Sequence, residues 1–281
     1  MIKKILFILV VLLLITIIWF LIPLSPTQSK FEEIVNERKE NYDEKGVYRV
    51  EDFAHLPVAL QKSIENGGFI GKPRAKYMNM YYEDVKFAQS VDGPALSIDY
   101  DQFNFSGSPA RVALIDSQVM GIPFEGLDIY IAERNEGEMR GVIGKLIPLF
   151  AERGAEVAMG AQVNYLAETL FLPTTILSDS IRFEEIGPHQ VFGEISYGGV
   201  NSSGHFYFNE EYELQRFYTE RRPAVASDGS VEYIPWSAEC SDYQTNEEGL
   251  RLPAHLKAIW HYPEGDFVYF DGRINHIRYG D

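Results

Sequence analysis

Alternating apolar and polar residues predict that most of the chain forms β-strands. After Lys72, segments rich in tyrosine, phenylalanine, valine and isoleucine are separated by glycine, proline or asparagine breaks, which recur about every 8–14 residues. In GLDIYIAE, residues 126–133, three aliphatic side chains fall on one face, and an aspartate and a tyrosine fall on the other. This alternation is typical of an antiparallel sheet with one buried face. The pattern predicts roughly eleven antiparallel strands.

One segment in the middle of the chain has a different pattern. From about Ala155 to Leu172 the residues are apolar on nearly every side, and Pro173 follows. This predicts a helix that other elements cover all round, and its small alanine and glycine residues would let it lie close to them. The predicted fold class is therefore β-rich α+β: a single curved antiparallel sheet, a half-barrel, wrapped around a central helix.

This central helix carries a polar edge. Asn164 and Glu168 are four residues apart, so they are neighbours on the helix surface, beside Tyr165. They could form a polar spot inside an apolar cavity, or a helix edge that touches water or an arginine. Arg221 or Arg222, at a strand end, could pair with Glu168, because a buried carboxylate needs such a partner to stay charged.

Two shorter helices are predicted before the sheet. Residues 29–41 are highly charged and form a short stalk helix. In residues 55–68, Leu56, Ala59, Leu60 and Ile64 recur at helical spacing before a double glycine, which predicts a short helix packed on the sheet.

The first residues predict a membrane anchor. Ile5 to Leu24 form a run of twenty uncharged residues, and a helix of that length spans a hydrocarbon core of about 30 Å. A cleaved signal peptide is the alternative, but its apolar region is normally only about 7–15 residues long. The predicted division is an anchor at 1–28, a stalk or linker at 29–46 and one half-barrel domain at 47–281. The short N-terminal flank favours a single-pass protein of the cytoplasmic membrane with its soluble domain outside the cytoplasm.

The net charge limits the partners. Residues 1–28 hold two of the 25 basic residues and none of the 41 acidic ones, so 23 basic and 41 acidic residues remain, a net charge of −18. Such a surface repels phosphate backbones, which argues against nucleic acid as a partner. Cys240 is the only cysteine and allows neither an internal disulfide nor a cysteine-rich metal site.

Catalytic and cofactor motifs are not found. The sequence has no nucleotide-binding glycine motif, no P-loop, no zinc-protease motif and no nucleophile elbow. Its six histidines are scattered without ligand spacing. We therefore expect no metal and no cofactor, and an enzyme is the less favoured class.

Aromatic residues are dense in the C-terminal half. Alternation places Ala258, Trp260 and Tyr262 on one face of a strand. Most of these aromatic residues are expected in the core, and a minority could line a groove for an apolar ligand.

A series of weak signals resembles a bacterial family of unknown function (DUF6544/DUF6920-like) over residues 50–279. The signals are Leu56–Pro57, Tyr165 to Glu168, Pro173, Arg221, Leu252–Pro253 and Trp260. The family often has an arginine where this chain has Asn164. The order of elements is also similar to the lipoprotein-carrier (LolA-like) half-barrel, which implies a lipid or another hydrophobic ligand by analogy.

Three functional hypotheses follow. The first is a membrane-anchored protein that binds a lipid or acyl chain inside the half-barrel, with Asn164, Tyr165, Glu168, Arg221, Trp260 and Tyr262 as candidate ligand-binding residues. The second is a structural or protein-interaction module of the cell envelope, with an unknown protein partner. The third is an enzyme that uses Glu168 as an acid or base in an apolar pocket.

Overall fold

The computed structural model describes residues 2–40, 45–225 and 229–280. The helices are α1 (Ile2–Leu21), α2 (Pro26–Glu40), α3 (Val58–Asn66) and α4 (Ala155–Ala167). The strands are β1 (Tyr77–Ala88), β2 (Ala95–Phe105), β3 (Ala110–Val119), β4 (Ile122–Ile131), β5 (Glu136–Ile143), β6 (Ile147–Arg153), β7 (Ile181–Gly187), β8 (Gln190–Tyr197), β9 (Val200–Phe208), β10 (Leu214–Val225), β11 (Val231–Ser241), β12 (Gln244–Thr245), β13 (Arg251–Leu252), β14 (His255–Tyr262) and β15 (Gly265–Gly280).

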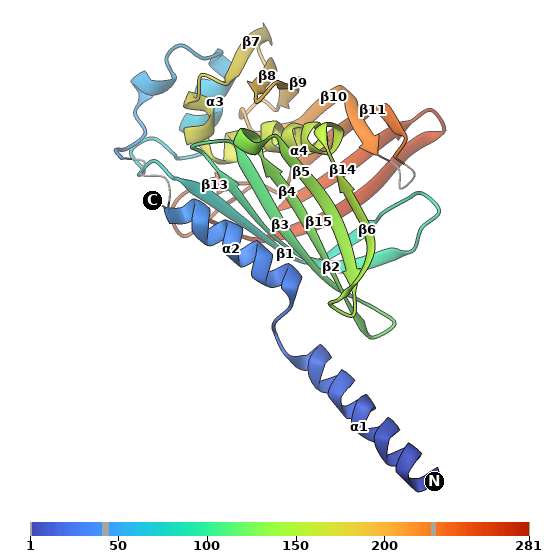
Figure 1. Cartoon of the computed structure of the whole chain (residues 1–281). Helices are drawn as coiled ribbons and strands as arrows, with labels where there is room; N and C mark the ends of the chain where they lie inside the picture. The colour runs from blue at the N-terminus through green and yellow to red at the C-terminus, as the bar shows by residue number, and fades with distance from the viewer. Residues whose placement is uncertain (1, 41–44, 226–228, 281) are drawn as a thin grey trace.

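The predicted half-barrel is confirmed. Within the described residues, thirteen strands form one sheet in the order β6-β5-β4-β3-β2-β1-β15-β14-β11-β10-β9-β8-β7, and β12 and β13 form a separate pair. The paired strands in this sheet are antiparallel, and the sheet is strongly curled (Figure 1). The predicted number of strands was too low. One reason is that MRGVIGKLIP is a hairpin of two strands, β5 and β6, turning at Gly144 and Lys145, which both have positive φ.

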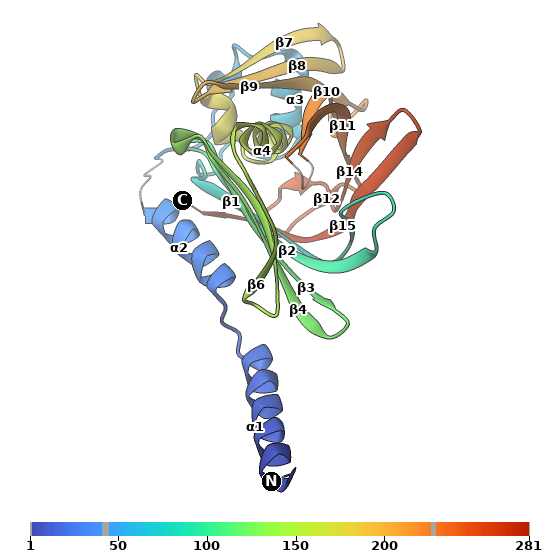
Figure 2. The ribbon, with the colours of Figure 1, turned by 45° about the vertical axis from the view of Figure 1, so that its right-hand side comes forward.

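The central helix α4 lies between the two halves of the sheet. It packs against β3, β4, β5 and β6 on one side and against β8, β9 and β10 on the other, and Figure 2 shows it end-on inside the curl. The approach to β5 is close, since a Cβ atom added at Gly137 would lie 2.1 Å from the Ala158 nitrogen. Gln162 is fully buried and joins both halves: it donates to the Tyr130 hydroxyl of β4 and accepts from the Ser202 hydroxyl of β9.

The helix is shorter than predicted. The α-helix ends at Ala167 rather than Leu172, and two 3₁₀ turns follow, Thr169–Phe171 and Pro173–Leu177. The threonine hydroxyls at 169 and 175 donate to backbone carbonyls nearby, at Leu166 and Leu172 respectively. These local bonds satisfy carbonyls that a continuing helix would use, and proline at 173 has no N–H to extend it.

The helix α3 caps one end of the half-barrel. The four apolar side chains predicted from helical spacing, Leu56, Ala59, Leu60 and Ile64, are all buried in the main core, beside the 3₁₀ turn Val50–Phe53. This core fills the end of the sheet around α4, with buried side chains from β1, β2, β3, β8, β9, β10, β11 and β14.

The segment predicted as a stalk includes most of α2, which packs on the outer, convex face of the sheet. Phe31, Ile34 and Val35 form a second core with apolar residues of β2, β3 and β4. Lys30 and Glu138 pair at 2.8 Å, and Arg38 pairs with Glu133. Residues 41–44 lie outside the described residues, and the domain limits at 28 and 46 remain a prediction.

The helix α1 has the properties of a membrane span. It is long and apolar enough to cross a bilayer by length and composition, and none of its residues is buried. Its C-terminal end contacts the β5–β6 turn, where the Trp19 indole donates to the Gly144 carbonyl at 3.2 Å.

We expect the docking of α2 to weaken in acid. Burial raises the pKa of Glu138, but Lys30 and Arg153 lower it more, so its folded pKa lies below the ordinary 4.5. The carboxylate therefore stabilises the fold fully above about pH 4.5, and this contribution is lost as pH falls through the lowered pKa. Glu138→Gln should reduce the free energy of unfolding by about 1–3 kcal/mol at pH 7, with a smaller difference below pH 4.

The measurement is urea denaturation of the full chain in detergent micelles between pH 3 and pH 7. Glu136→Gln, on the same strand, removes a partly exposed carboxylate and serves as the control. A difference between Glu138→Gln and the natural chain that does not change with pH would contradict the expectation.

Candidate functional site

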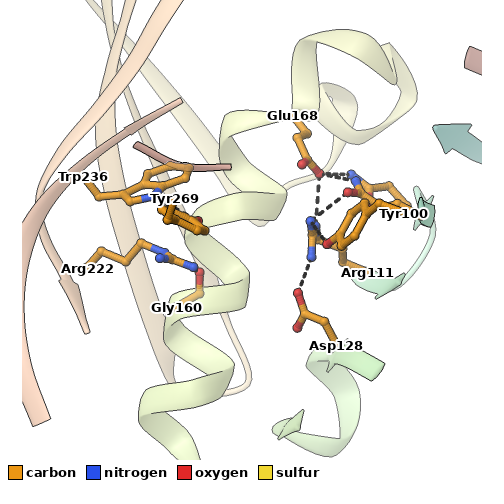
Figure 3. A network of polar contacts seen from close by, with 10 residues as sticks. Tyr100, Arg111, Asp128, Gly160, Glu168, Arg222, Trp236 and Tyr269 are labelled. Atoms are coloured by element: carbon orange, nitrogen blue, oxygen red, sulfur yellow. Dashed lines mark hydrogen bonds and ion pairs between the residues drawn. The ribbon is translucent and has the colours of Figure 1, made fainter. Parts of the chain in front are cut away.

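A buried polar network lies on the concave face of the sheet against the end of α4. Its members are Tyr100, Gln102 and Asn104 of β2, Arg111 of β3, Asp128 of β4 and Glu168 at the C-cap of α4 (Figure 3). The members on strands lie on the face that carries the main core, because Met80 and Ala113, which both pair with Gln102, belong to that core.

Arg111 is at the centre of this network. Its Nη1 donates to Asp128 Oδ2 at 2.6 Å, and its Nε donates to Glu168 Oε2 at 3.3 Å. Its Nη2 donates to the Tyr100 hydroxyl at 2.9 Å and to Gln102 Oε1 at 2.7 Å. The guanidinium is thus held by four acceptors, in the fork geometry that arginine offers and lysine does not.

The Glu168 carboxylate is held by three donors at one oxygen. Besides Arg111, the side-chain amides of Gln102 and Asn104 each donate to Oε2 at 2.7 Å. A carboxylate bound in this way is neutralised and fixed, which leaves it a poor general acid or base. This geometry counts against the hypothesis of an enzyme that uses Glu168.

The charge states of Arg111 and Tyr100 are fixed at neutral pH. Burial lowers the pKa of Arg111, but Tyr100, Glu168 and Asp128 raise it more, so it lies well above its ordinary value. Burial raises the pKa of Tyr100. Arginine therefore stays charged and tyrosine stays protonated, and the network acts as a compensated ionic group inside the core.

The partner of Glu168 differs from the one considered from the sequence. Arg111 pairs with it, whereas Arg221 is exposed with its guanidinium 4.7 Å from the Tyr233 ring centroid. Arg222 reaches a different part of α4 and donates from Nε to the Gly160 carbonyl at 3.2 Å. The pairing with Arg221 or Arg222 was therefore wrong.

The two other candidates on α4 differ in burial and in their hydrogen bonds. Tyr165 is buried, and its hydroxyl donates to the Phe105 carbonyl at 2.8 Å. Asn164 is partly exposed, and within the described residues its Oδ1 atom is buried without a hydrogen-bond partner. An unpaired buried acceptor costs about 1–3 kcal/mol, so Asn164 is the α4 side chain with unused hydrogen-bonding capacity.

A second group of side chains surrounds Arg222 on the other side of α4. Its guanidinium lies 4.8 Å from the Trp236 ring centroid and 4.6 Å from that of Trp260, within cation–π range. The Trp236 indole donates to the Tyr269 hydroxyl at 3.2 Å, and Trp260 lies against Tyr262 at 6.5 Å. Figure 3 shows Arg222, Trp236 and Tyr269 across α4 from Glu168.

Part of the concave face remains partly exposed. Apolar side chains packed against the edge of the main core gather near the turns β1–β2, β3–β4, β5–β6 and β14–β15: Phe87, Leu96, Val119, Phe150, Trp260 and Tyr269. We call these six residues the apolar rim. The rim and the Arg111 network thus mark opposite regions of the same concave face, one open to solvent and one closed.

A chain of hydrogen bonds across β11, β14 and β15 was missed by the sequence analysis. Ser237 Oγ lies 2.9 Å from His261 Nε2, and His261 Nδ1 lies 2.6 Å from Asp266 Oδ1. Ser237 has no exposed surface, and its strand is paired on both sides, so the backbone N–H groups around it are used in the sheet. The arrangement holds strands together and lacks the accessible nucleophile and oxyanion donors that hydrolysis needs.

The two pockets on the surface are not lined by the predicted residues. Two pockets of about 300 and about 410 Å³ are lined mainly by polar and charged side chains such as Glu213 and Arg251 in the first and Arg216 and Lys257 in the second. Among the described residues, no group of three or more histidine, cysteine, aspartate or glutamate side chains could hold a metal ion.

The comparisons with known proteins identify the family. The model of a family of unknown function, DUF6544, matches residues 46–272. The chain belongs to this family. The membership predicted from the sequence is therefore confirmed.

Among solved structures, the chain is similar to a domain from Vibrio parahaemolyticus that is named for outer membrane lipoprotein sorting. The identity is 10%, the TM-score is 0.39, and the match covers 78% of this chain and 91% of that one. No curated protein matches the sequence.

We expect the Arg111 network to stabilise the domain strongly. Arg111→Met should reduce the free energy of unfolding by about 3–5 kcal/mol, because it leaves two carboxylates without their cation in the core. Arg111→Met combined with Glu168→Leu should cost less than the sum of the two single changes, with a coupling of about 0.5–3 kcal/mol.

The measurement is urea denaturation followed by circular dichroism. Arg134→Met is the matched control, since Arg134 pairs with Glu37 at 3.0 Å with about half of each side chain exposed and should contribute under about 1 kcal/mol. If Arg111→Met were as mild as this control, the network would have no stabilising role.

Proposed function

We propose that this protein is a membrane-anchored binding protein whose apolar rim holds a hydrophobic molecule, such as a lipid or an acyl chain. In this proposal α1 spans the cytoplasmic membrane once, and the half-barrel lies outside the cytoplasm. The observation that carries the proposal is the apolar rim: partly exposed aromatic and aliphatic side chains on the concave face of the sheet, along an edge whose β5–β6 turn contacts α1.

The rim offers apolar contact area at a location where lipid is available. Monomeric soluble proteins rarely leave contiguous apolar surface exposed without a binding role. The rigid aromatic rings of Trp260 and Tyr269 are fixed by Arg222 and Trp236, so little conformational entropy would be lost on binding. These features favour a preformed apolar site.

Polar groups beside the rim could hold the head of such a ligand. Arg222 is anchored to the Gly160 carbonyl, and Asn164 follows Gly160 by about one helical turn, roughly 5–6 Å. Asn164 Oδ1 could accept a hydrogen bond that it lacks within the described residues. Of the six candidates from the sequence, Trp260 belongs to the rim, and Asn164 and Tyr262 are proposed as further ligand contacts beside it.

The remaining candidates have other surroundings. Tyr165 and Glu168 lie in the closed region, where the core and the Arg111 network fill the space next to α4, and Arg221 points to Tyr233. The ligand is therefore proposed on the open rim rather than around the polar edge of α4.

Lipid analysis of purified variants tests the proposal. The double variant Trp260→Ser with Tyr269→Ser should bind a fluorescent fatty acid at least about tenfold more weakly than the natural chain, because each buried ring contributes about 1.5–3 kcal/mol. Organic extraction and mass spectrometry should also recover less co-purified lipid from the double variant.

The control is Tyr81→Ser. Tyr81 is a partly exposed aromatic residue on the convex face, stacked on His276 at 5.4 Å, and this variant keeps α1 with its surrounding lipid. Equal lipid content in all three proteins would contradict the proposal, since it would assign the lipid to α1 alone. Tyr262→Ser, at the outer side of the same aromatic group, provides a milder change should the double variant fold poorly.

A structural or protein-interaction module of the cell envelope is the second candidate. The densely filled interior around α4 favours it, because much of the half-barrel is core. Under this alternative, cross-linking in cells would capture the same protein with the natural chain and with the Trp260→Ser, Tyr269→Ser variant, and no lipid would depend on these residues.

A further inference from the structure

We propose that the turns of the β3–β4 and β5–β6 hairpins form a docking surface that inserts into the interface of the bilayer that α1 crosses. We call residues 119–122 and 143–149 the docking tips. This inference rests on the proposed membrane anchoring by α1 but not on the proposed ligand. Its function would be to fix the half-barrel against the lipid surface rather than leave it free on a tether.

The docking tips carry unusually exposed apolar side chains. Met120 is 99% exposed, and Leu146, Ile147 and Leu149 are 62%, 63% and 56% exposed. They lie on two hairpins that are adjacent in the sheet, since β4 pairs with β5. Single exposed apolar residues are ordinary, but four on neighbouring turns make a patch that water disfavours.

The tips lie at the level where α1 would leave the membrane. Trp19 and Ile22, at the C-terminal end of α1, both bond to the β5–β6 turn: the Trp19 indole donates to the Gly144 carbonyl, and the Ile22 carbonyl accepts from the Lys145 amine. A Cβ atom at Gly144 would lie 3.6 Å from the Phe20 ring and 4.0 Å from Ile122, so α1 meets both tips at one point. Tryptophan at this end of a span is typical of the membrane interface.

The hairpins and the anchor have a common orientation. In Figures 1 and 2 the two hairpin turns extend toward α1, while β7, β8 and α3 lie at the opposite side of the domain. A bilayer around α1 would therefore meet the tips before it met the rest of the sheet.

The charge of the tips suits a lipid surface. Lys145 is their only charged residue, in a chain with a net charge of −16. Its side chain is 6% exposed, and its amine caps the free carbonyl end of α1, a favourable position for a cation. The acidic remainder of the domain would be repelled by anionic headgroups, which leaves the tips as the surface able to approach them.

The apolar rim is continuous with this surface. Val119 belongs to both, and Phe150 of the rim directly follows the exposed Leu149. Docked tips would thus place one end of the rim at the lipid headgroups, which gives an apolar ligand a short route between membrane and sheet.

Depth-dependent fluorescence quenching tests the docking. The full chain is reconstituted into vesicles of phosphatidylcholine and phosphatidylglycerol, with an environment-sensitive dye attached at Met120→Cys, Leu146→Cys, Leu13→Cys or Ile186→Cys. The natural chain, whose Cys240 is buried, gives the labelling background. Lipids with a spin label near the headgroup should quench the dye at 120 and 146, and lipids labelled deep in the acyl chain should quench it at 13.

The positions at 13 and 186 make the outcomes separable. Ile186 is 49% exposed on the β7–β8 hairpin away from α1, and its dye should stay unquenched. Quenching at 13 with none at 120 and 146 would overturn the docking and leave the anchor intact. No quenching at 13 would instead overturn the membrane anchoring itself.

A charge-insertion pair provides the matched control. Met120→Asp with Leu149→Asp should abolish most of the shallow quenching at 146 while quenching at 13 persists, because desolvating the carboxylates opposes insertion. Ile186→Asp with Val58→Asp changes two equally apolar, exposed positions far from α1 and should leave quenching at 146 unchanged. Equal effects of the two pairs would contradict a specific role for the tips.

Discussion

The fold depends on the covering of one apolar helix. Because α4 has buried residues around most of its circumference, it requires contacts on opposite sides, and the sheet supplies them by curling until β3–β6 and β8–β10 both reach it. Gln162 fixes this closure with bonds to Tyr130 and Ser202 from the two halves. Without α4 the two ends of the sheet would have no common partner, and the concave face would lose its shape.

This closure also divides the concave face into two regions with different chemistry. At the C-terminal end of α4, Arg111 and Glu168 neutralise each other inside the core, and such a compensated pair fixes geometry without offering reactivity. On the other side of α4, the Arg222 guanidinium contacts two indole rings and donates to the Gly160 carbonyl. The aromatic surface there remains partly open. The first region is structural, and the second retains unused apolar area.

The architecture was predicted well from the sequence, because the alternation of apolar and polar residues in the strands and a helix that is apolar on nearly every side are local signals. It did not predict Arg111, because an arginine flanked by alanine and valine on a strand gives no local indication of which face it takes. Gln102 and Asn104 did give a local indication of a buried polar site. Alternation places both on the same face of β2 as Tyr100, and the other side chains next to Tyr100 are apolar. Arg111 and Glu168 are 57 residues apart, and they meet because the C-terminal end of α4 packs against the concave face of the sheet. The β5–β6 hairpin was similarly concealed, because its turn at Gly144 and Lys145 is so short that the apolar residues on both sides of it resemble a single strand.

Under the proposed anchoring, the position of α1 accounts for the exposed apolar side chains of the docking tips beside it. A hydrophobic surface that faced bulk water would promote aggregation, whereas one held beside a bilayer is covered by lipid and carries little such cost. The Trp19 and Lys145 contacts join the end of α1 to the β5–β6 turn. These few bonds therefore set the orientation of the half-barrel relative to α1. The outer face of the sheet is covered by α2 through Phe31, Ile34 and Val35, whereas the partly exposed apolar side chains of the rim lie on the concave face.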